Sequence, residues 1–159
     1  MSKVLVVYYS RSGNTKSMAE AVGEGVKNAG GEVEVKSVND IQDPADMVNY
    51  DGIIMGSPTY YGVLAGPLKD FLDKSIKVHQ RLEGKVGGAF ASCGIEGGGS
   101  ESTVLSILQA LLVHGMVVHG FSGIGHYGPV STGKPDQRAL DECKQLGQRV
   151  ARLADKLID

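Results

Sequence analysis

The segment Ser10-Arg11-Ser12-Gly13-Asn14-Thr15 contains the groups that can bind a phosphate. It lies between a β-branched and aromatic run at residues 4–9 and a stretch of helical periodicity, so it predicts a helix start after a strand. Backbone N–H groups are free there, the helix dipole is positive, and hydroxyl and amide side chains add donors. The same residues favour an ordinary helix cap, so this segment alone leaves both interpretations open. It matches neither a P-loop nor a G-x-G-x-x-G dinucleotide fingerprint.

Two further loops offer surfaces for a flat ligand. The first is Ser57-Pro58-Thr59-Tyr60-Tyr61-Gly62, whose adjacent tyrosines suit contact with a planar ring system. The second is Ser92-Cys93-Gly94-Ile95-Glu96-Gly97-Gly98-Gly99, where glycines leave main-chain N–H groups open to a ligand. Loop tyrosines also act as packed lids and glycine clusters as flexible turns. The inference therefore depends on all three loops sharing one site.

Strand-like and helix-like segments alternate along the chain. Apolar runs predict strands at residues 4–9, 33–37, 52–56, 86–91 and 116–121. Apolar spacing predicts helices after Thr15, near Pro67, at residues 100–114 and from about Pro135, with a short helix opening at Asp43-Pro44. This alternation is typical of an α/β fold, a doubly wound five-stranded parallel sheet with helices on both faces. Ligands of such sheets bind beyond the carboxyl ends of the strands, where the three loops lie.

The overall composition excludes several classes of partner. The net charge is −2 and the pI is about 6.1, so no nucleic-acid partner is expected, and the charge is modest for a small electron carrier. The apolar run at residues 4–9 is too short to insert into a membrane, and the N-terminus lacks a secretory pattern. Cys93 and Cys143 do not indicate a disulfide framework. We expect one domain over residues 1–159 and a cytoplasmic location.

Several of these segments resemble known families. The first loop, after Val-Val-Tyr-Tyr, resembles the FMN-phosphate loop of flavodoxins, with Arg11 where a small hydroxyl residue is commoner. Another branch of that superfamily is the NAD(P)H:quinone oxidoreductases, formerly called tryptophan-repressor-binding proteins. Resemblance to this branch covers the following segments: Pro58-Thr59-Tyr60-Tyr61-Gly62, residues 66–73, Gly84-Lys85, Phe90-Ala91-Ser92, residues 97–99 and His114-Gly115-Met116-Val117. The resemblance extends over nearly the whole chain and implies a flavodoxin-like sheet with strand order 2-1-3-4-5.

The resemblance also implies where FMN binds. The first loop would hold the phosphate, and the other two would flank the isoalloxazine ring. The implied cofactor-binding residues are Ser10, Arg11, Ser12, Gly13, Asn14, Thr15, Pro58, Thr59, Tyr60, Tyr61, Gly62, Ser92, Cys93, Gly94, Gly97 and Gly98. No catalytic side chain is implied, because the flavin carries the chemistry. The four histidines show no metal-ligand spacing.

Three functions are compatible with these features. The first is an NAD(P)H-dependent oxidoreductase that passes electrons to a quinone-like acceptor. The second is a flavodoxin-type carrier between redox proteins, in which the Tyr61-Gly62 peptide turns its carbonyl toward the flavin and favours a one-electron state. The third is a phosphate-binding or response-regulator-like module. It is disfavoured because Tyr8-Tyr9-Ser10 stands where that module needs clustered acids.

The chain departs from the quinone-reductase pattern at three points. That branch usually has two adjacent histidines before Gly-Met, whereas this chain has Val113-His114. The segment at residues 121–134 is shorter than the corresponding segment of that branch, and the chain contains no tryptophan. The sequence leaves open the physiological electron donor and acceptor and the choice between NADH and NADPH. It also leaves open whether the protein is a monomer or a homo-oligomer. His126 and Tyr127, after the last strand, are candidates for contact with flavin or substrate, whereas His119 on that strand is expected to be packed.

Overall fold

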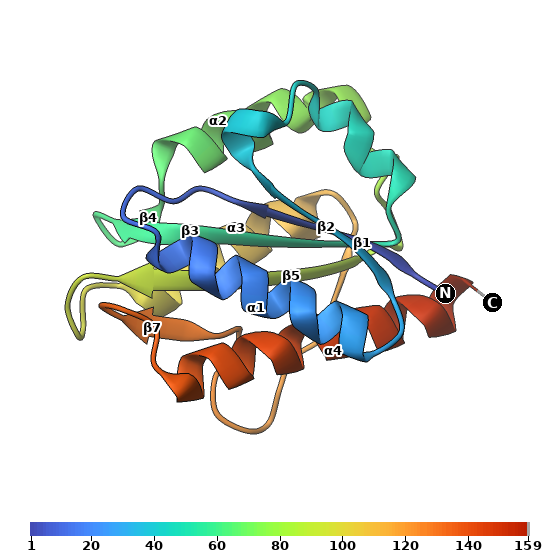
Figure 1. Cartoon of the computed structure of the whole chain (residues 1–159). Coiled ribbons are helices and arrows are strands. Elements are labelled where there is room, and N and C mark those ends of the chain that lie inside the picture. The colour runs from blue at the N-terminus through green and yellow to red at the C-terminus, as the bar shows by residue number, and fades with distance from the viewer. Residues whose placement is uncertain (159) are drawn as a thin grey trace.

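Seven strands form one sheet at the centre of the computed structural model, which describes residues 1–158. Five of them follow the order β2-β1-β3-β5-β6, which confirms the expected order 2-1-3-4-5. These are β1 (Lys3–Tyr8), β2 (Glu32–Ser37), β3 (Gly52–Tyr60), β5 (Val86–Cys93) and β6 (Val117–Val118), all parallel. The short strand β4 (Val63–Leu64) pairs antiparallel with β3, and β7 (Val130–Thr132) pairs parallel with β5 (Figure 1).

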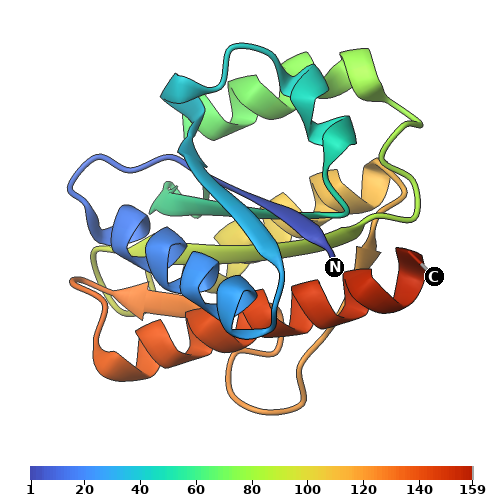
Figure 2. The ribbon, with the colours of Figure 1, turned by 45° about the vertical axis from the view of Figure 1, so that its right-hand side comes forward.

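The prediction of one continuous last strand at residues 116–121 is wrong. Val118 pairs with Gly87 and Val130 pairs with Ala91. Between these two pairs the chain advances twelve residues, whereas β5 advances only four. Eight residues are therefore looped out of the sheet between β6 and β7. The loop, residues 119–129, projects past α4 and is orange in Figure 2. Its glycines weaken strand propensity, which is why a β-branched start at Val117 does not continue.

Helices cover both faces of the sheet, as the alternation predicts (Figures 1 and 2). One face carries α1 (Asn14–Asn28) and α4 (Gln137–Ile158); the other carries α2 (Gly66–Lys74), α3 (Ser100–Val113) and the 3-10 helices Val38–Asp40, Pro44–Asn49 and Ser75–Val78. Val4 and Val6 of β1 pack against the first set of helices, and Leu5 and Val7 against the second. β1 is thus buried on both faces, which explains its unbroken apolar sequence.

Helices α1 and α4 approach each other closely because glycines face the contact. A β-carbon built at Gly25 would lie 2.0 Å from the Lys144 carbonyl oxygen, and one at Gly147 would lie 2.1 Å from the Val22 carbonyl oxygen. Neither position has room for a side chain. Since α1 begins at the first loop, this contact helps to fix that loop against the sheet.

His114 lies buried at the carboxyl end of α3, against the 3-10 helix Ser75–Val78. Ser75 Oγ donates to the Leu72 carbonyl at 2.6 Å, so His114 Nε2, at 2.7 Å from Ser75 Oγ, must donate to it. Burial, together with the nearby His79, lowers the pKa of His114 below its usual value. The folded protein therefore favours the neutral ring.

We expect this histidine to make stability depend on pH. The unfolded chain keeps the ordinary histidine pKa of about 6.5, so His114 supports the native state fully above that pH. Its contribution is lost as the pH falls from there toward the lowered pKa. Urea unfolding at several pH values between about 5 and 8 measures the slope. His114→Gln should reduce the dependence of the free energy of unfolding on pH, whereas His79→Gln, at an exposed position, should retain most of it. Equal pH dependence in the wild type and His114→Gln would contradict this expectation.

Candidate functional site

Three segments meet at the carboxyl edge of the sheet and line one cavity of ≈ 250 Å³. All three predicted loops contribute to its wall. The lining residues are Arg11, Ser12, Asn14 and Thr15 from the first loop, Pro58, Thr59 and Tyr60 from β3, and Ser92, Cys93 and Gly94 at the end of β5. All of these are among the residues expected to bind the cofactor. Six others, Ser10, Gly13, Tyr61, Gly62, Gly97 and Gly98, lie in the same loops but outside this lining.

The first loop enters α1 through Gly13, whose φ of 98° lies in the left-handed region. Ser10 Oγ accepts a hydrogen bond from the Gly13 N–H at 3.1 Å and closes the loop. Within residues 1–158, no side chain caps this helix start and no acidic residue stands in its first turn. The free N–H groups and the positive end of the dipole therefore lie at the cavity without a competing negative charge. Such an arrangement binds an anion.

Thr15 links the first loop to the third. Its side chain is almost fully buried, and Oγ1 lies 2.8 Å from Oγ of Ser92 at the end of β5. Each hydroxyl has one hydrogen to donate, so this bond uses one hydrogen and leaves the other free. When Ser92 donates, the Thr15 hydroxyl is oriented by the protein and its hydrogen stays available to a ligand in the cavity.

The second loop is shorter than the sequence indicates. β3 continues through Tyr60, which pairs with Val63, so only Tyr61 and Gly62 form the turn into β4. Their φ values of 51° and 81° are both positive, as a two-residue type I′ hairpin requires. The Tyr61 side chain is fully exposed, and Tyr60 is partly exposed at the cavity. A flat ring can therefore meet aromatic surface at this edge.

The third loop and α3 hold the hairpin in place. Ser102 Oγ donates to the Gly62 carbonyl at 2.6 Å and lies 2.9 Å from the Gly99 carbonyl. A β-carbon built at Gly99 would lie 2.8 Å from the Gly62 α-carbon, so the two backbones touch. Thr103 Oγ1 donates to the Gly99 carbonyl at 2.9 Å and lies 3.1 Å from Thr59 Oγ1. The amino end of α3 thus positions both the glycine loop and the hairpin.

Other residues singled out from the sequence lie away from this cavity. Cys143 is buried in the core beside α1, and burial raises the pKa of its thiol. His119 is exposed, so the expectation that it is packed is wrong, because the chain leaves the sheet after Val118. His126 and Tyr127 line a different cavity, beside α4, of ≈ 820 Å³.

Sequence reasoning missed that second cavity. One signal was present: Glu142 falls between Ala139 and Leu146 on the apolar stripe of α4, at a position where a charged residue is unusual. Its carboxylate forms an ion pair with Arg138 at 2.8 Å.

Comparison with known proteins agrees with this geometry. Residues 5–109 match the model of the flavodoxin domain. The chain is 36% identical to the NAD(P)H dehydrogenase (quinone) of Archaeoglobus fulgidus, over 99% of this chain and 100% of that protein. It is 38% identical to a flavodoxin of Aquifex aeolicus, over 100% of this chain and 90% of that protein.

Two solved structures share the architecture. A flavodoxin from the domain Archaea has a TM-score of 0.79 and 32% identity, with 96% of this chain and 99% of that chain covered. A flavodoxin, WrbA-like protein from Agrobacterium tumefaciens has a TM-score of 0.83 and 27% identity, with 98% and 99% covered. The matched domain, the full-length relatives and the shared sheet agree: this chain belongs to the flavodoxin domain family.

Proposed function

We propose that this protein binds FMN at the carboxyl edge of its sheet and uses it to pass electrons from NAD(P)H to a quinone-like acceptor. The observation that supports this most is the cavity lined by all three predicted loops. It combines an uncapped helix start, which suits the phosphate, with the aromatic surface of Tyr60, and the exposed Tyr61 follows in the same hairpin; these surfaces suit the ring.

The size of the cavity fits one end of the cofactor. Pockets that enclose a whole small molecule usually measure about 300–1,000 Å³, and this one is ≈ 250 Å³. We infer that it encloses the phosphate and the chain next to it. The hairpin and the third loop would then hold the isoalloxazine outside the enclosed part. When bound, FMN supplies the redox chemistry, and the protein binds and orients it.

The choice of reaction rests on the relatives. Proteins named NAD(P)H dehydrogenase (quinone) from Archaeoglobus fulgidus and Sinorhizobium fredii align with 99% and 100% of this chain. A protein with this reaction must give both a nicotinamide and an acceptor access to the flavin. The Tyr61 side chain is fully exposed, so a flavin held along this hairpin would be accessible to both.

A single preparation tests both cofactor and reaction. The purified protein, saturated with added flavin if necessary, is denatured, and the released chromophore is identified by chromatography. The intact protein is mixed anaerobically with NADH or NADPH in a stopped-flow instrument, and a soluble benzoquinone is then added. We expect FMN as the chromophore, rapid bleaching of its visible absorbance by one of the two dinucleotides, and recovery over many turnovers. Recovery of FAD, or no flavin binding even with added FMN, would reject the cofactor assignment.

The second candidate is a flavodoxin-type electron carrier. A specific observation favours it: the Aquifex aeolicus flavodoxin aligns with this chain of 159 residues over 168 positions, whereas the quinone dehydrogenases of Archaeoglobus fulgidus and Sinorhizobium fredii align over 190 and 199. Those enzymes therefore contain segments that this chain does not. A carrier would bleach negligibly with NAD(P)H alone and would accumulate half-reduced flavin when titrated with dithionite. These two results together would reject the oxidoreductase proposal in favour of the electron carrier.

We also propose a cytoplasmic location. Cys93 and Cys143 are free thiols and both are buried, which suits a reducing compartment. Within residues 1–158, no helix is long and apolar enough to cross a membrane.

A further inference from the structure

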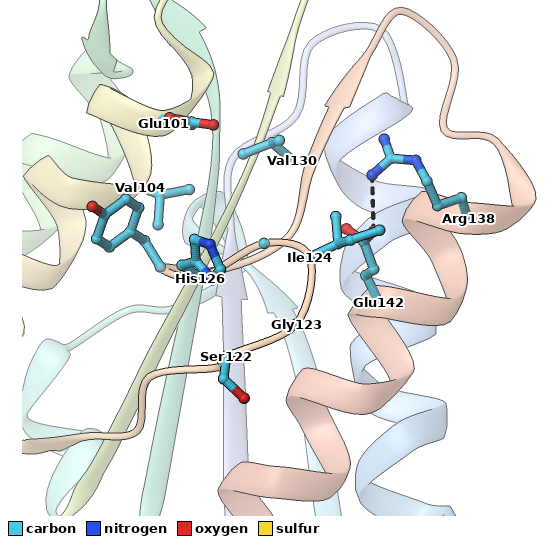
Figure 3. A pocket seen from close by; sticks show the side chains of 12 residues that line it. Glu101, Val104, Ser122, Gly123, Ile124, His126, Val130, Arg138 and Glu142 are labelled. Carbon is cyan, nitrogen blue, oxygen red and sulfur yellow. Dashed lines mark hydrogen bonds and ion pairs between the residues drawn. The ribbon is translucent and has the colours of Figure 1, made fainter.

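A second cavity lies between α3, the loop at residues 119–129 and the amino end of α4. Its volume is ≈ 820 Å³, which is within the range that takes a small organic molecule. In Figure 3, Glu101 and Val104 of α3 lie on one side and the Arg138–Glu142 pair of α4 on the other. His126 and Ile124 of the loop lie between them.

The loop that covers this cavity has a defined shape. The Phe121 N–H donates to the His126 carbonyl at 3.1 Å, and His126 Nδ1 lies 2.8 Å from the Phe121 carbonyl. The Gly128 N–H donates to the Gly125 carbonyl at 3.1 Å. Cavity walls built from this loop therefore have backbone support of their own.

A buried carboxylate oxygen in this cavity has no partner. Glu142 is only 9% exposed, and its Oε1 accepts from the Arg138 guanidinium at 2.8 Å. Its Oε2 is buried and has no hydrogen-bond partner among residues 1–158. The loop closes over this oxygen, since a β-carbon built at Gly125 would lie 3.5 Å from it, so a donor from the cavity reaches it only when Gly125 moves aside. Leaving such an oxygen without a donor is costly, so a ligand that brings an N–H group here removes that cost.

The remaining walls define what kind of donor fits. Arg138 neutralises Glu142 only in part, because the arginine side chain is half exposed, and Glu101 adds a second negative charge. Val104, Val130 and Ile124 form apolar surfaces. Tyr127 adds an aromatic ring, which attracts a cation. The cavity thus combines two carboxylates and one guanidinium with apolar and aromatic walls.

We propose that this cavity is a binding site for a small planar organic cation such as an amidine, whose N–H group hydrogen-bonds to Glu142 Oε2 once the loop at Gly125 has moved aside. Its flat part packs against Val104, Val130 and Ile124, and Tyr127 borders it. The site is separate from the cavity assigned to FMN, since the two share no lining residue.

The two sites are nevertheless joined by one strand. Val130 lines the second cavity and pairs with Ala91, while the Gly133 N–H after β7 donates to the Cys93 carbonyl at 2.7 Å. Cys93 lines the first cavity. A ligand that moves the loop before β7 therefore acts on the strand that abuts the flavin loops.

Benzamidine is the test probe, because it is a planar ring with one amidinium group. Amide shifts of Gly123, Gly125 and Gly128 in ¹H–¹⁵N spectra report its binding, on the purified protein with and without added FMN. We expect saturable shifts at these glycines for benzamidine, much weaker shifts for neutral benzamide, and none for benzoate. Shifts at these glycines in the absence of FMN would support the second binding site even if the proposed flavin function failed.

Three variants separate recognition from damage to the fold. Glu142→Gln removes the charge at nearly the same shape and should weaken benzamidine binding about ten- to a hundredfold, the range for a charge-assisted hydrogen bond. Arg138→Met removes the competing cation and should leave binding unchanged or tighter, which a merely disrupted site would not do. Asp141→Asn, at an exposed position of the same helix, should have no effect. Equal binding to the wild type and Glu142→Gln, or equal shifts with all three probes, would overturn the proposal.

Discussion

Replacing Thr15 with valine is expected to weaken FMN binding about ten- to a hundredfold, because a hydrogen bond to a charged oxygen contributes roughly 1.5–3 kcal/mol. Valine keeps the shape of the buried side chain, so the effect reports the hydroxyl. The hydroxyl lies at the cavity and is oriented by Ser92 Oγ at 2.8 Å. Titration of flavin fluorescence against the flavin-free protein gives the dissociation constant.

Two further variants make this result specific. Thr15→Ser retains the hydroxyl and should bind FMN nearly as well as the wild type. Ser92→Ala removes only the orienting partner and should have a smaller effect than Thr15→Val. If Thr15→Val binds FMN with unchanged affinity, the phosphate lies elsewhere and the role proposed for the first loop is wrong.

Gly147→Ala is expected to lower the free energy of unfolding by about 2–4 kcal/mol, although alanine is the better helix former by about 1 kcal/mol. The added β-carbon would lie 2.1 Å from the Val22 carbonyl oxygen, and backbone cannot rotate away as a side chain can. Helices α1 and α4 must separate, and α1 starts at the first loop. We therefore expect weaker FMN binding as a secondary effect.

Urea unfolding measures the loss, and Gly66→Ala is the matched control. Gly66 opens α2, and a β-carbon built there meets no atom within 4 Å among the described residues. Its replacement should change the free energy of unfolding by about 1 kcal/mol at most, because the gain in helix propensity is opposed by the restriction on a residue before Pro67. A Gly147→Ala protein as stable as the wild type would show that the two helices can move apart at little cost.

The candidate site was predictable because its signals are local. Hydroxyls and a glycine before a helix, and loops after buried strands, are features of short segments. The topology of a parallel sheet then brings their ends to one edge. The structure adds what no local pattern contains: Thr15 meets Ser92 and Thr59 meets Thr103, across gaps of 77 and 44 positions.

The errors have a common physical origin in tertiary context. The Tyr61-Gly62 hairpin was missed because type I′ turns usually begin with Asn, Asp or Gly, and here the protein holds a tyrosine at positive φ. Apolar residues also lie on more than one side of α3, and Leu105 and Leu112 are 38% and 57% exposed. A helix on a sheet buries only the side that faces it.

The interrupted edge of the sheet has a consequence for self-association. A long regular edge strand presents free N–H and C=O groups to any other molecule, and such edges nucleate aggregation. Here that edge is divided into strands of two and three residues, and the looped-out chain returns with Gly128 directly against β5. At the opposite edge, β2 carries Glu34 in ion pairs with Lys3 and Lys36. Deleting the eight looped-out residues to make one continuous strand would remove the protection at the first edge, and the chain would lose solubility before it lost its fold.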